Sequence, residues 1–434
     1  MSNVKLPTNP YKGTRDFYPR DMKLRNWFFG KIRETLERSA FDEYNGPMLE
    51  SLELYEAKSG EEIAGKQTYN FVDRGGRRLA IRPEMTPTVA RMVAAKLGEL
   101  NFPLKWFSIP NMYRYERAQR GRLREFWQLN VDIFGVDGYE ADLETVAAAI
   151  HIMQSLGADE TMFRVHINNR RFFNDVIAAI AGTDADGARA VSKVVDRKDK
   201  IDRETYEKEM TDLGLTGEQI ARIDALYHMS VEQATDICPD SVGSGELRSL
   251  FSALRAGGLD RYCVFDFGII RGLDYYTGTV FEVFDEDPEN NRAMFGGGRY
   301  DNLVSLFVGD AKVSGVGFGM GDVTLELFLE AHGLIPADLY GGEVKVLVTR
   351  FDDVPYEAYT AIADELRAAG ITASVYLGQK KFGKQLDYAA RENYTHAVIM
   401  GGNEYAAGQV KVKDLSLREE TTISRAELTG YFKA

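Results

Sequence analysis

Apolar residues recur at helical spacing in several stretches of the N-terminal part of the chain. Residues 22–38 repeat apolar side chains at every third or fourth position, which predicts an amphipathic helix. A cap on Thr86 or Thr88 is expected to start a second helix that continues to Leu97. A third helix is predicted over 142–156. Each helix would bury one face against a neighbouring layer.

Other segments are rich in aromatic and β-branched residues, as strands are. The strings LKWFSIPNMYRYE and EFWQLNVDIFG predict two paired antiparallel strands with an Arg- and Gly-containing loop between them. Four strand-like strings follow after residue 258: YCVFDFGII, YYTGTVFEVFD, AMFGGGRYDNL and VSGVGFGMG. Between the two groups the sequence is Ala- and Asp-rich and helical in pattern. This order predicts one α+β sheet domain interrupted by a helical insertion.

The last part of the chain has a different pattern. Strands are predicted at KVLVT, TASVYL, HAVIMGG and QVKVKDL, with helices over 356–369 and 384–393. Strands that alternate with helices of this length are typical of a small α/β domain with a parallel or mixed sheet. The sequence therefore predicts a sheet domain in two parts, residues 1–168 and 259–335. A helical insertion over 169–258 separates these parts, and a last domain covers 343–434.

Composition agrees with a folded protein of several domains. The chain has 434 residues, 44% of them hydrophobic and 27% charged, which is ordinary for a globular protein. The 53 Lys and Arg against 66 Asp and Glu give a net charge of −13, which argues against nonspecific coating of nucleic acid. Two cysteines are too few for a disulfide framework. Without an apolar signal region or an apolar run near the ~20 residues of a membrane helix, we expect a cytoplasmic protein with no membrane partner.

Several well-known sites are missing from the sequence. No P-loop string G-x-x-x-x-G-K-[ST] and no G-x-S-x-G elbow occurs. GVGFGMG does not fit the G-x-G-x-x-G pattern that opens a helix, which argues against a Rossmann nucleotide site there. The five histidines have no metal-type spacing and the two cysteines do not join them, so no resident metal site is predicted.

Two short segments carry candidate chemistry by their composition. The string YRYERAQRGRLREF holds five arginines, at positions 114, 117, 120, 122 and 124. Such a run is either a solvated face or a phosphate site, and its nearly pure arginine content between two aromatic strands favours phosphate. In RPEMT, Glu84 and Thr86 at a strand-to-helix turn could bind an ammonium group or could cap the helix, and both interpretations stay open.

These strings resemble a known family. Arg114 and Glu116 lie in a string similar to the core of motif 2 of class II aminoacyl-tRNA synthetases, and RGLDYYTGTVFE resembles the histidine-specific signature of histidyl-tRNA synthetases. GTRDFYP, RPEMT and GGGRYDNL are similar to segments of the same family in the same order. The resemblance covers nearly the whole chain. It implies a ligase of protein biosynthesis that uses ATP to form histidyl-adenylate from L-histidine and transfers the histidyl group to tRNA(His), with release of AMP and pyrophosphate.

The resemblance also implies an architecture. It gives a six-stranded antiparallel catalytic sheet of the class II type with a helical insertion, followed by a C-terminal α/β anticodon-binding domain. The string FDEYNGPMLESLELY occupies the motif 1 region, which builds the dimer interface of class II enzymes. A two-fold homodimer is therefore expected.

Roles for the nucleotide-binding residues follow from the same resemblance. Arg114 is expected to hold the α-phosphate, Arg122 the outer phosphates and Glu116 the adenine end, with Mg²⁺ accompanying ATP. Arg271 is expected to bridge the histidine carboxylate and the α-phosphate, so Arg114 and Arg271 are the candidate catalytic residues. Because both reacting groups are anionic, arginines that neutralise them would lower the electrostatic barrier.

The resemblance further implies a set of histidine-binding residues: Glu84, Met85, Thr86, Arg114, Gln128, Asp132, Arg271, Tyr275 and Tyr276. Glu84 and Thr86 fit the ammonium group, while Asp132 and Tyr276 are candidates for the two imidazole nitrogens. In the long motif 2 loop, Gln119 and Arg124 are the candidate contacts to tRNA.

Three positions depart from the family pattern. Met85 stands where glycine is frequent, so its side chain should point away from the pocket, and Asp132 replaces a frequent glutamate. Thr324, in the motif 3 string GFGMGDVTL, stands where an ATP-binding arginine is usual. Thr324 favours an alternative, a histidine-sensing paralogue such as the regulatory subunit of ATP phosphoribosyltransferase. The intact arginine loop and the C-terminal α/β domain favour the ligase.

Overall fold

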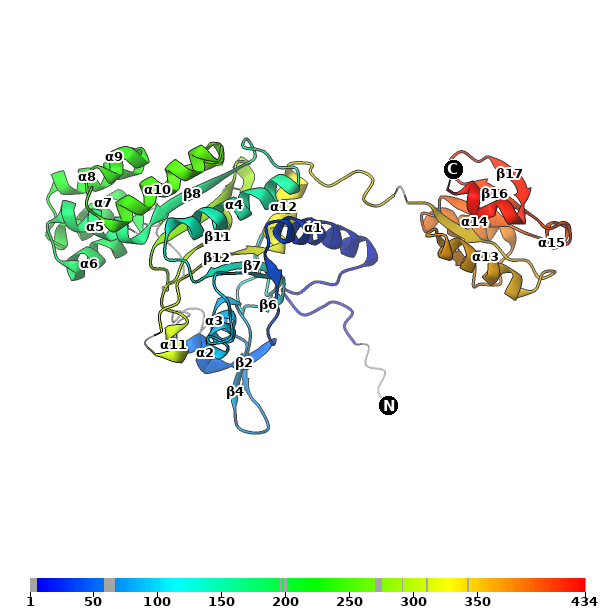
Figure 1. The fold of residues 1–434 in the computed structure, drawn as a ribbon, viewed down its shortest axis with the longest axis horizontal. Coiled ribbons are helices and arrows are strands. Elements are labelled where there is room, and N and C mark those ends of the chain that lie inside the picture. Colours follow the sequence, from blue (N-terminus) through cyan, green and yellow to red (C-terminus); the bar gives the residue numbers. More distant parts are fainter. Residues whose placement is uncertain are drawn as a thin grey trace. The chain divides into compact units, whose positions relative to one another are not determined.

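The computed structural model describes residues 6–57, 67–195, 197–198, 201–269, 275–290, 292–309, 311–341 and 343–433. The chain forms two compact units, Met1–Ile335 and Pro336–Ala434, drawn in Figure 1. Each unit has its own sheet and its own buried core.

A large sheet organises the N-terminal unit. Its strands in the described residues are β1 (Asp42–Glu43), β5 (Leu104–Ser108), β6 (Asn111–Tyr113), β7 (Glu125–Phe134), β8 (Phe163–Asn169), β9 (Cys263–Phe265), β10 (Thr279–Asp285), β11 (Ala293–Arg299) and β12 (Gly315–Gly321). They are ordered β1-β5-β7-β12-β11-β10-β8-β9, and β6 pairs with β7. The six strands from β5 to β8 along this path pair antiparallel, while β1 and β9 pair parallel at the two edges. The predicted antiparallel sheet is confirmed.

A small second sheet lies before the arginine-rich segment in sequence. Its strands are β2 (Leu49–Ser51), β3 (Asn70–Val72) and β4 (Arg78–Ile81), in the order β2-β4-β3. Helix α2 spans Leu52–Glu56, and helix α3 spans Thr86–Ala95 directly after the RPEMT turn.

The predicted cap of α3 is wrong. The residue before the helix is Met85, and no side chain caps this end. Pro87 lies in the first turn and has no N–H to satisfy, so the helix needs one capping partner fewer. The helix also ends at Ala95, before the expected Leu97.

Longer helices cover the large sheet. They are α1 (Pro19–Arg38), α4 (Tyr139–Ser155) and α12 (Asp322–Ala331). The short α11 (Ser305–Val308) contacts α3. Helix α1 buries Leu24, Phe28, Ile32 and Leu36, as the apolar repeat predicted. It contacts α4, which in turn lies on β7 and β12.

The described part of the segment between β8 and β9 contains helices and no strand, as predicted. It contains α5 (Arg170–Ala181), α6 (Ala185–Val195), α7 (Arg203–Asp212), α8 (Gly217–Ala225), η3 (Leu226–His228), α9 (Val231–Thr235), α10 (Val242–Ala256) and η4 (Asp260–Tyr262). The first helix begins where the Asn169 side chain accepts from the backbone N–H groups of Arg171 and Phe172. Figure 1 shows these helices gathered beyond the end of the sheet that carries β8.

The C-terminal unit alternates strands and helices. Its elements are β13 (Lys345–Val348), α13 (Tyr356–Ala368), β14 (Thr372–Val375), α14 (Phe382–Arg391), β15 (His396–Ile399), α15 (Gly402–Ala407), β16 (Gln409–Asp414), β17 (Glu420–Ser424), η6 (Arg425–Glu427) and α16 (Leu428–Tyr431). The sheet order is β14-β13-β15-β16-β17, parallel among the first three strands and antiparallel in the last two pairings. The sheet is therefore mixed. Among the described helices of the chain, none is long and apolar enough to cross a membrane.

Candidate active site

The arginine-rich segment forms a tight hairpin loop between β6 and β7. At its base the Arg114 N–H donates to the Arg124 carbonyl at 2.9 Å, and at its tip Gln119 and Arg122 exchange backbone hydrogen bonds of 3.0 and 2.9 Å. Gly121 takes a φ of +77° at the turn, a conformation that favours glycine. The tip therefore presents exposed side chains on a defined backbone.

The arginines of this hairpin have different surroundings. Arg114 Nε donates to the Pro83 carbonyl at 2.8 Å, which ties the hairpin to the RPEMT turn. Arg122 is exposed, and its Nη1 lies 3.7 Å from Glu116 Oε2. Arg124 Nε donates to the Glu116 carbonyl at 3.0 Å and its Nη1 donates to the Tyr11 hydroxyl at 2.6 Å, so its guanidinium braces the base of the loop.

The N-terminal arm that carries GTRDFYP supports this hairpin and α12. The Gly13 carbonyl accepts from the backbone N–H groups of Arg124 and Glu125, at 2.8 and 3.1 Å. Arg15 Nη2 donates to the buried Asp322 carboxylate at 2.7 Å, and the other oxygen of Asp322 accepts from the Trp127 N–H at 3.0 Å. The arm thus fixes β7 and the start of α12 to each other.

A buried carboxylate lies at the RPEMT turn. Glu84 is only 3% exposed, and its Oε2 accepts from the Tyr275 hydroxyl at 3.1 Å. Burial and the nearby charge of Glu84 raise the pKa of Tyr275 well above its ordinary value, so the phenol stays a donor. The Tyr276 ring lies edge-on to the Tyr275 ring, with centres 5.1 Å apart. Met85 is fully buried and its terminal methyl lies beside Gly46, so its side chain is used in packing.

A second buried carboxylate lies on β7. Asp132 is 2% exposed; its Oδ1 accepts from the Tyr300 hydroxyl and its Oδ2 from the Tyr44 hydroxyl, the latter at 3.5 Å. Burial raises the pKa of Asp132 to about 7, against the opposite effect of the two hydrogen bonds. Tyr44 and Tyr300 were not among the predicted site residues. Their only signal in the sequence was that each lies in a string shared with the family, FDEYNG and GGGRYDNL.

Glycines of β12 make room for the polar side chains of β7. A Cβ at Gly317 would lie 2.6 Å from Asp132 Oδ1, and a Cβ at Gly319 would lie 1.8 Å from Gln128 Nε2. The glycines of the string GVGFGMG therefore leave open the space that the Asp132 and Gln128 side chains occupy. Among the described residues, the buried Oε1 of Gln128 has no hydrogen-bond donor. Such an unpaired acceptor is costly unless a ligand satisfies it.

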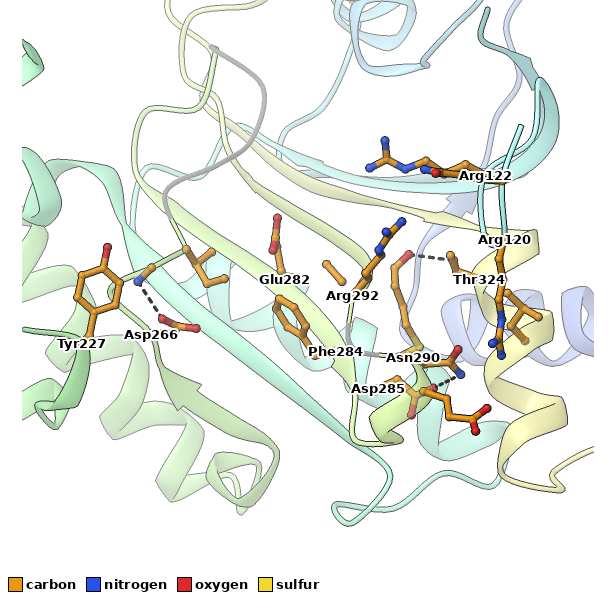
Figure 2. Close-up of a pocket in the computed structure, with 18 residues that line it drawn as sticks. Arg120, Arg122, Tyr227, Asp266, Glu282, Phe284, Asp285, Asn290, Arg292 and Thr324 are labelled. Atoms are coloured by element: carbon orange, nitrogen blue, oxygen red, sulfur yellow. Dashed lines mark hydrogen bonds between the residues drawn. The ribbon is translucent and has the colours of Figure 1, made fainter. Parts of the chain in front are cut away.

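An open cavity of about 1200 Å³ lies in the N-terminal unit, and Glu282 lines it. Burial and the charges of Glu84, Asp132 and Glu282 raise the pKa of Tyr276, so this tyrosine connects the cavity wall to the two buried carboxylates. Figure 2 shows the walls of the cavity: the hairpin tip with Arg120 and Arg122, β10 with Glu282, the connection that carries Arg292, and α12 with Thr324. This connection contains the short helix η5, Pro288–Asn290. In the described residues no group of three or more His, Cys, Asp or Glu side chains is placed to hold a metal ion.

The structure brings most of the predicted residues into three sets. Glu84, Thr86, Arg114, Tyr275 and Tyr276 gather at the RPEMT turn. Gln128 and Asp132, four residues apart on β7, share one face of the sheet. Glu116, Gln119 and Arg122 belong to the hairpin beside the cavity. Arg271 lies outside the described residues.

Comparisons with known proteins agree with this architecture. The family model of histidyl-tRNA synthetase matches residues 13–323, and that of an anticodon binding domain matches residues 344–434. The chain is 43% identical over 431 residues to the histidine–tRNA ligase of Leptospira biflexa, covering 98% of each protein. It is 39% identical over 424 residues to that of Opitutus terrae, covering 96% of each.

A solved structure extends the comparison to the fold. The crystal structure of histidyl-tRNA synthetase from Nostoc sp. PCC 7120 superposes with a TM-score of 0.81, at 25% identity, and covers 99% of both chains. The similarity includes both units of this chain. The chain belongs to the histidyl-tRNA synthetase family.

Proposed function

We propose that this protein activates L-histidine with ATP and transfers the histidyl group to tRNA(His). The observation that carries the proposal is a cluster of buried acceptors that Tyr276 and Glu282 connect to a cavity lined with arginines. The first suits a cationic, hydrogen-bond-donating amino acid, and the second suits a polyphosphate. Few reactions need both in adjacent positions, and adenylation of histidine is one of them.

Histidine fills the buried pocket. Its ammonium group donates to Glu84, Thr86 and the unpaired Oε1 of Gln128. Its imidazole N–H donates to Asp132, and Tyr276 pairs with the other ring nitrogen. Because Met85 uses its side chain in packing, only its backbone faces histidine. An analogue that leaves these buried groups unpaired would be rejected by up to ~10⁴–10⁵-fold.

ATP occupies the neighbouring cavity together with Mg²⁺, as the magnesium complex of the nucleotide. A carboxylate oxygen of histidine attacks the α-phosphorus, and the bond from that phosphorus to the bridging oxygen breaks as pyrophosphate leaves. Arg114 holds the α-phosphate from the side of the RPEMT turn, and Arg271 bridges it to the carboxylate. Arg122 binds the outer phosphates and Glu116, beside it, the adenine end. Neutralising two anionic reactants in this way lowers the barrier.

The second half-reaction passes the histidyl group to a tRNA hydroxyl and releases AMP. Gln119 at the exposed hairpin tip is the better of the two candidate tRNA contacts, because the Arg124 guanidinium is engaged with Glu116 and Tyr11. Residues 343–434 bind the anticodon region. The chain acts as a cytoplasmic homodimer through the motif 1 segment that includes β1 and β2, an assignment that analytical ultracentrifugation tests.

One pair of measurements tests the proposal. Purified protein should catalyse ATP–pyrophosphate exchange that depends on histidine, and should charge tRNA(His). A histidine-sensing regulator would bind histidine and show neither activity. Exchange that appears equally with other amino acids would contradict the assignment of the buried pocket to histidine.

A further inference from the structure

The cavity carries a cation that the roles above do not use. Arg292 lies in the connection between β10 and β11, is exposed, and lines the cavity. Among the described residues its guanidinium makes no hydrogen bond and no ion pair, in contrast to Arg122, which faces Glu116. Figure 2 shows the Arg292 side chain extending into the middle of the cavity, toward the wall that carries Arg122, whereas Arg120 extends the other way.

The backbone that carries Arg292 is fixed on two sides. Opposite β10 the register of β11 shifts, with Val283 facing Phe295 but Phe284 facing Ala293, so that Met294 is an extra residue. Such a bulge redirects the neighbouring side chains. The Met294 carbonyl accepts from Thr324 Oγ1 at 2.9 Å, which ties this point to α12. The backbone next to Arg292 is therefore held in place at the start of β11.

The wall made by α12 offers no positive charge at Thr324. Besides the Met294 carbonyl, the Thr324 hydroxyl donates to the Gly321 carbonyl at 3.2 Å. The Thr324 methyl group lies 3.6 Å from the position that a Cβ on Gly121 would take. Thr324 therefore joins the β11 start to the hairpin side of the cavity. The guanidinium groups that line the cavity come from the hairpin on one side and from Arg292 on another.

We propose that Arg292 is an ATP-binding residue that holds the β- and γ-phosphates and the pyrophosphate as it leaves. The proposal rests on the adenylation reaction proposed above. In that reaction the electron pair of the broken bond passes to pyrophosphate, which gains negative charge. A planar guanidinium can bind two phosphate oxygens at once, and its contribution grows as that charge develops. Arg292 and Arg122 then grip the triphosphate from two directions.

The test compares Arg292→Ala and Arg292→Lys with the parent and with Arg222→Ala, which removes an exposed arginine of α8 outside the cavity. Arg292→Ala should lower kcat/KM for ATP in adenylation by about 10²-fold, the scale of losing one preorganised charge contact. It should raise the KM for pyrophosphate in the reverse reaction and leave the KM for histidine and the thermal unfolding midpoint unchanged. Arg292→Lys should keep part of the adenylation rate, because the lysine ammonium keeps the positive charge but cannot bind two phosphate oxygens as the planar guanidinium does.

The outcomes separate this inference from the function on which it rests. An active parent with Arg292→Ala as fast as Arg222→Ala would overturn the role of Arg292 and leave the ligase function standing. A loss in which the KM for histidine rises as much as the KM for pyrophosphate would also overturn it, since that pattern indicates general damage to the site. A parent without histidine-dependent exchange would instead refute the proposed function.

Discussion

The buried residues proposed to bind histidine and the arginine-lined cavity proposed to hold ATP are built by opposite means. In the pocket, Asp132 and Glu84 are almost completely buried and already hydrogen-bonded to tyrosines. In the cavity, Arg120, Arg122 and Arg292 are exposed, and the closest carboxylate contact of Arg122 is 3.7 Å. Under the proposed function, the buried residues select histidine because an unsuitable ligand leaves their polar groups unpaired, and the exposed arginines of the cavity attract a polyanion by their charge.

The largest expected effect is at the junction of the two regions. If Arg271 bridges the histidine carboxylate and the α-phosphate, Arg271→Ala should reduce the rate of adenylate formation by about 10²–10³-fold. Arg271→Lys should restore only part of it, because an ammonium cannot span two acceptors as a guanidinium does. Pre-steady-state adenylate formation is the measurement. An alanine variant with the parent rate would remove Arg271 from the mechanism and leave the two regions without a bridge.

The next effect concerns the tyrosines around Asp132. The hydrogen bond from Tyr300 lowers the pKa of this carboxyl, so Tyr300→Phe should raise it above about 7. A protonated Asp132 cannot accept the imidazole N–H with that oxygen, so the KM for histidine should rise by about 10-fold or more at pH 7. The KM should fall back toward the parent value at pH 8.5, where the carboxylate reforms.

Tyr44→Phe is the matched control for this prediction. Its hydroxyl lies 3.5 Å from Asp132 Oδ2, a weaker contact, so the rise in KM should be smaller. Tyr276 also faces this carboxylate and stays neutral over the tested range, because burial raises its pKa. A rise in the KM for histidine that is equal in both variants and independent of pH would show that the tyrosines serve only packing.

A steric change should disturb the pocket and spare the cavity. A Cβ on Gly319 would lie 1.8 Å from Gln128 Nε2, so Gly319→Ala must displace that side chain. Losing one hydrogen bond to the ammonium group should raise the KM for histidine by about 10-fold, with the KM for ATP within twofold. Steady-state kinetics with histidine and ATP varied in turn give the two KM values. A parallel rise in the KM for ATP would mean that the two regions are not separable at β12.

The two regions also differ in how far the sequence predicted them. Asp132, Gln128 and Glu84 lie in strings that resemble the family and were predicted from that resemblance, as was Tyr275, which donates to Glu84. The two tyrosines that donate to Asp132 were not predicted. Tyr44 and Tyr300 contact Asp132 from residues 88 and 168 positions away in the chain, and such contacts leave no local pattern. Arg292 was not among the predicted site residues, because in the sequence an arginine in an irregular connection cannot be told from a solvated charge.

The same physical limit applies to the fold. The apolar repeat of α1 and the aromatic alternation of β7 follow from burial on one face, and both were predicted. β17 was not, because four of its five residues are exposed and carry no apolar alternation. The predicted cap of α3 on Thr86 or Thr88 was wrong, because Pro87 in the first turn removes one N–H group that would need a capping partner.

The smallest effect should come from salt, and it bears on both regions at once. Exposed charges are screened within ~8 Å at 0.15 M ionic strength and within ~3 Å at 1 M, whereas buried groups are screened much less. Raising NaCl from about 0.05 to 0.5 M should therefore raise the KM for ATP several-fold and change the KM for histidine by less than twofold. Exchange assays at fixed pH and fixed free Mg²⁺ provide both values. Arg292→Ala should show a weaker salt dependence of the KM for ATP than the parent, because one of the screened charges is already gone. Equal salt dependence for the two substrates would mean that the cavity does not hold ATP by its exposed arginines.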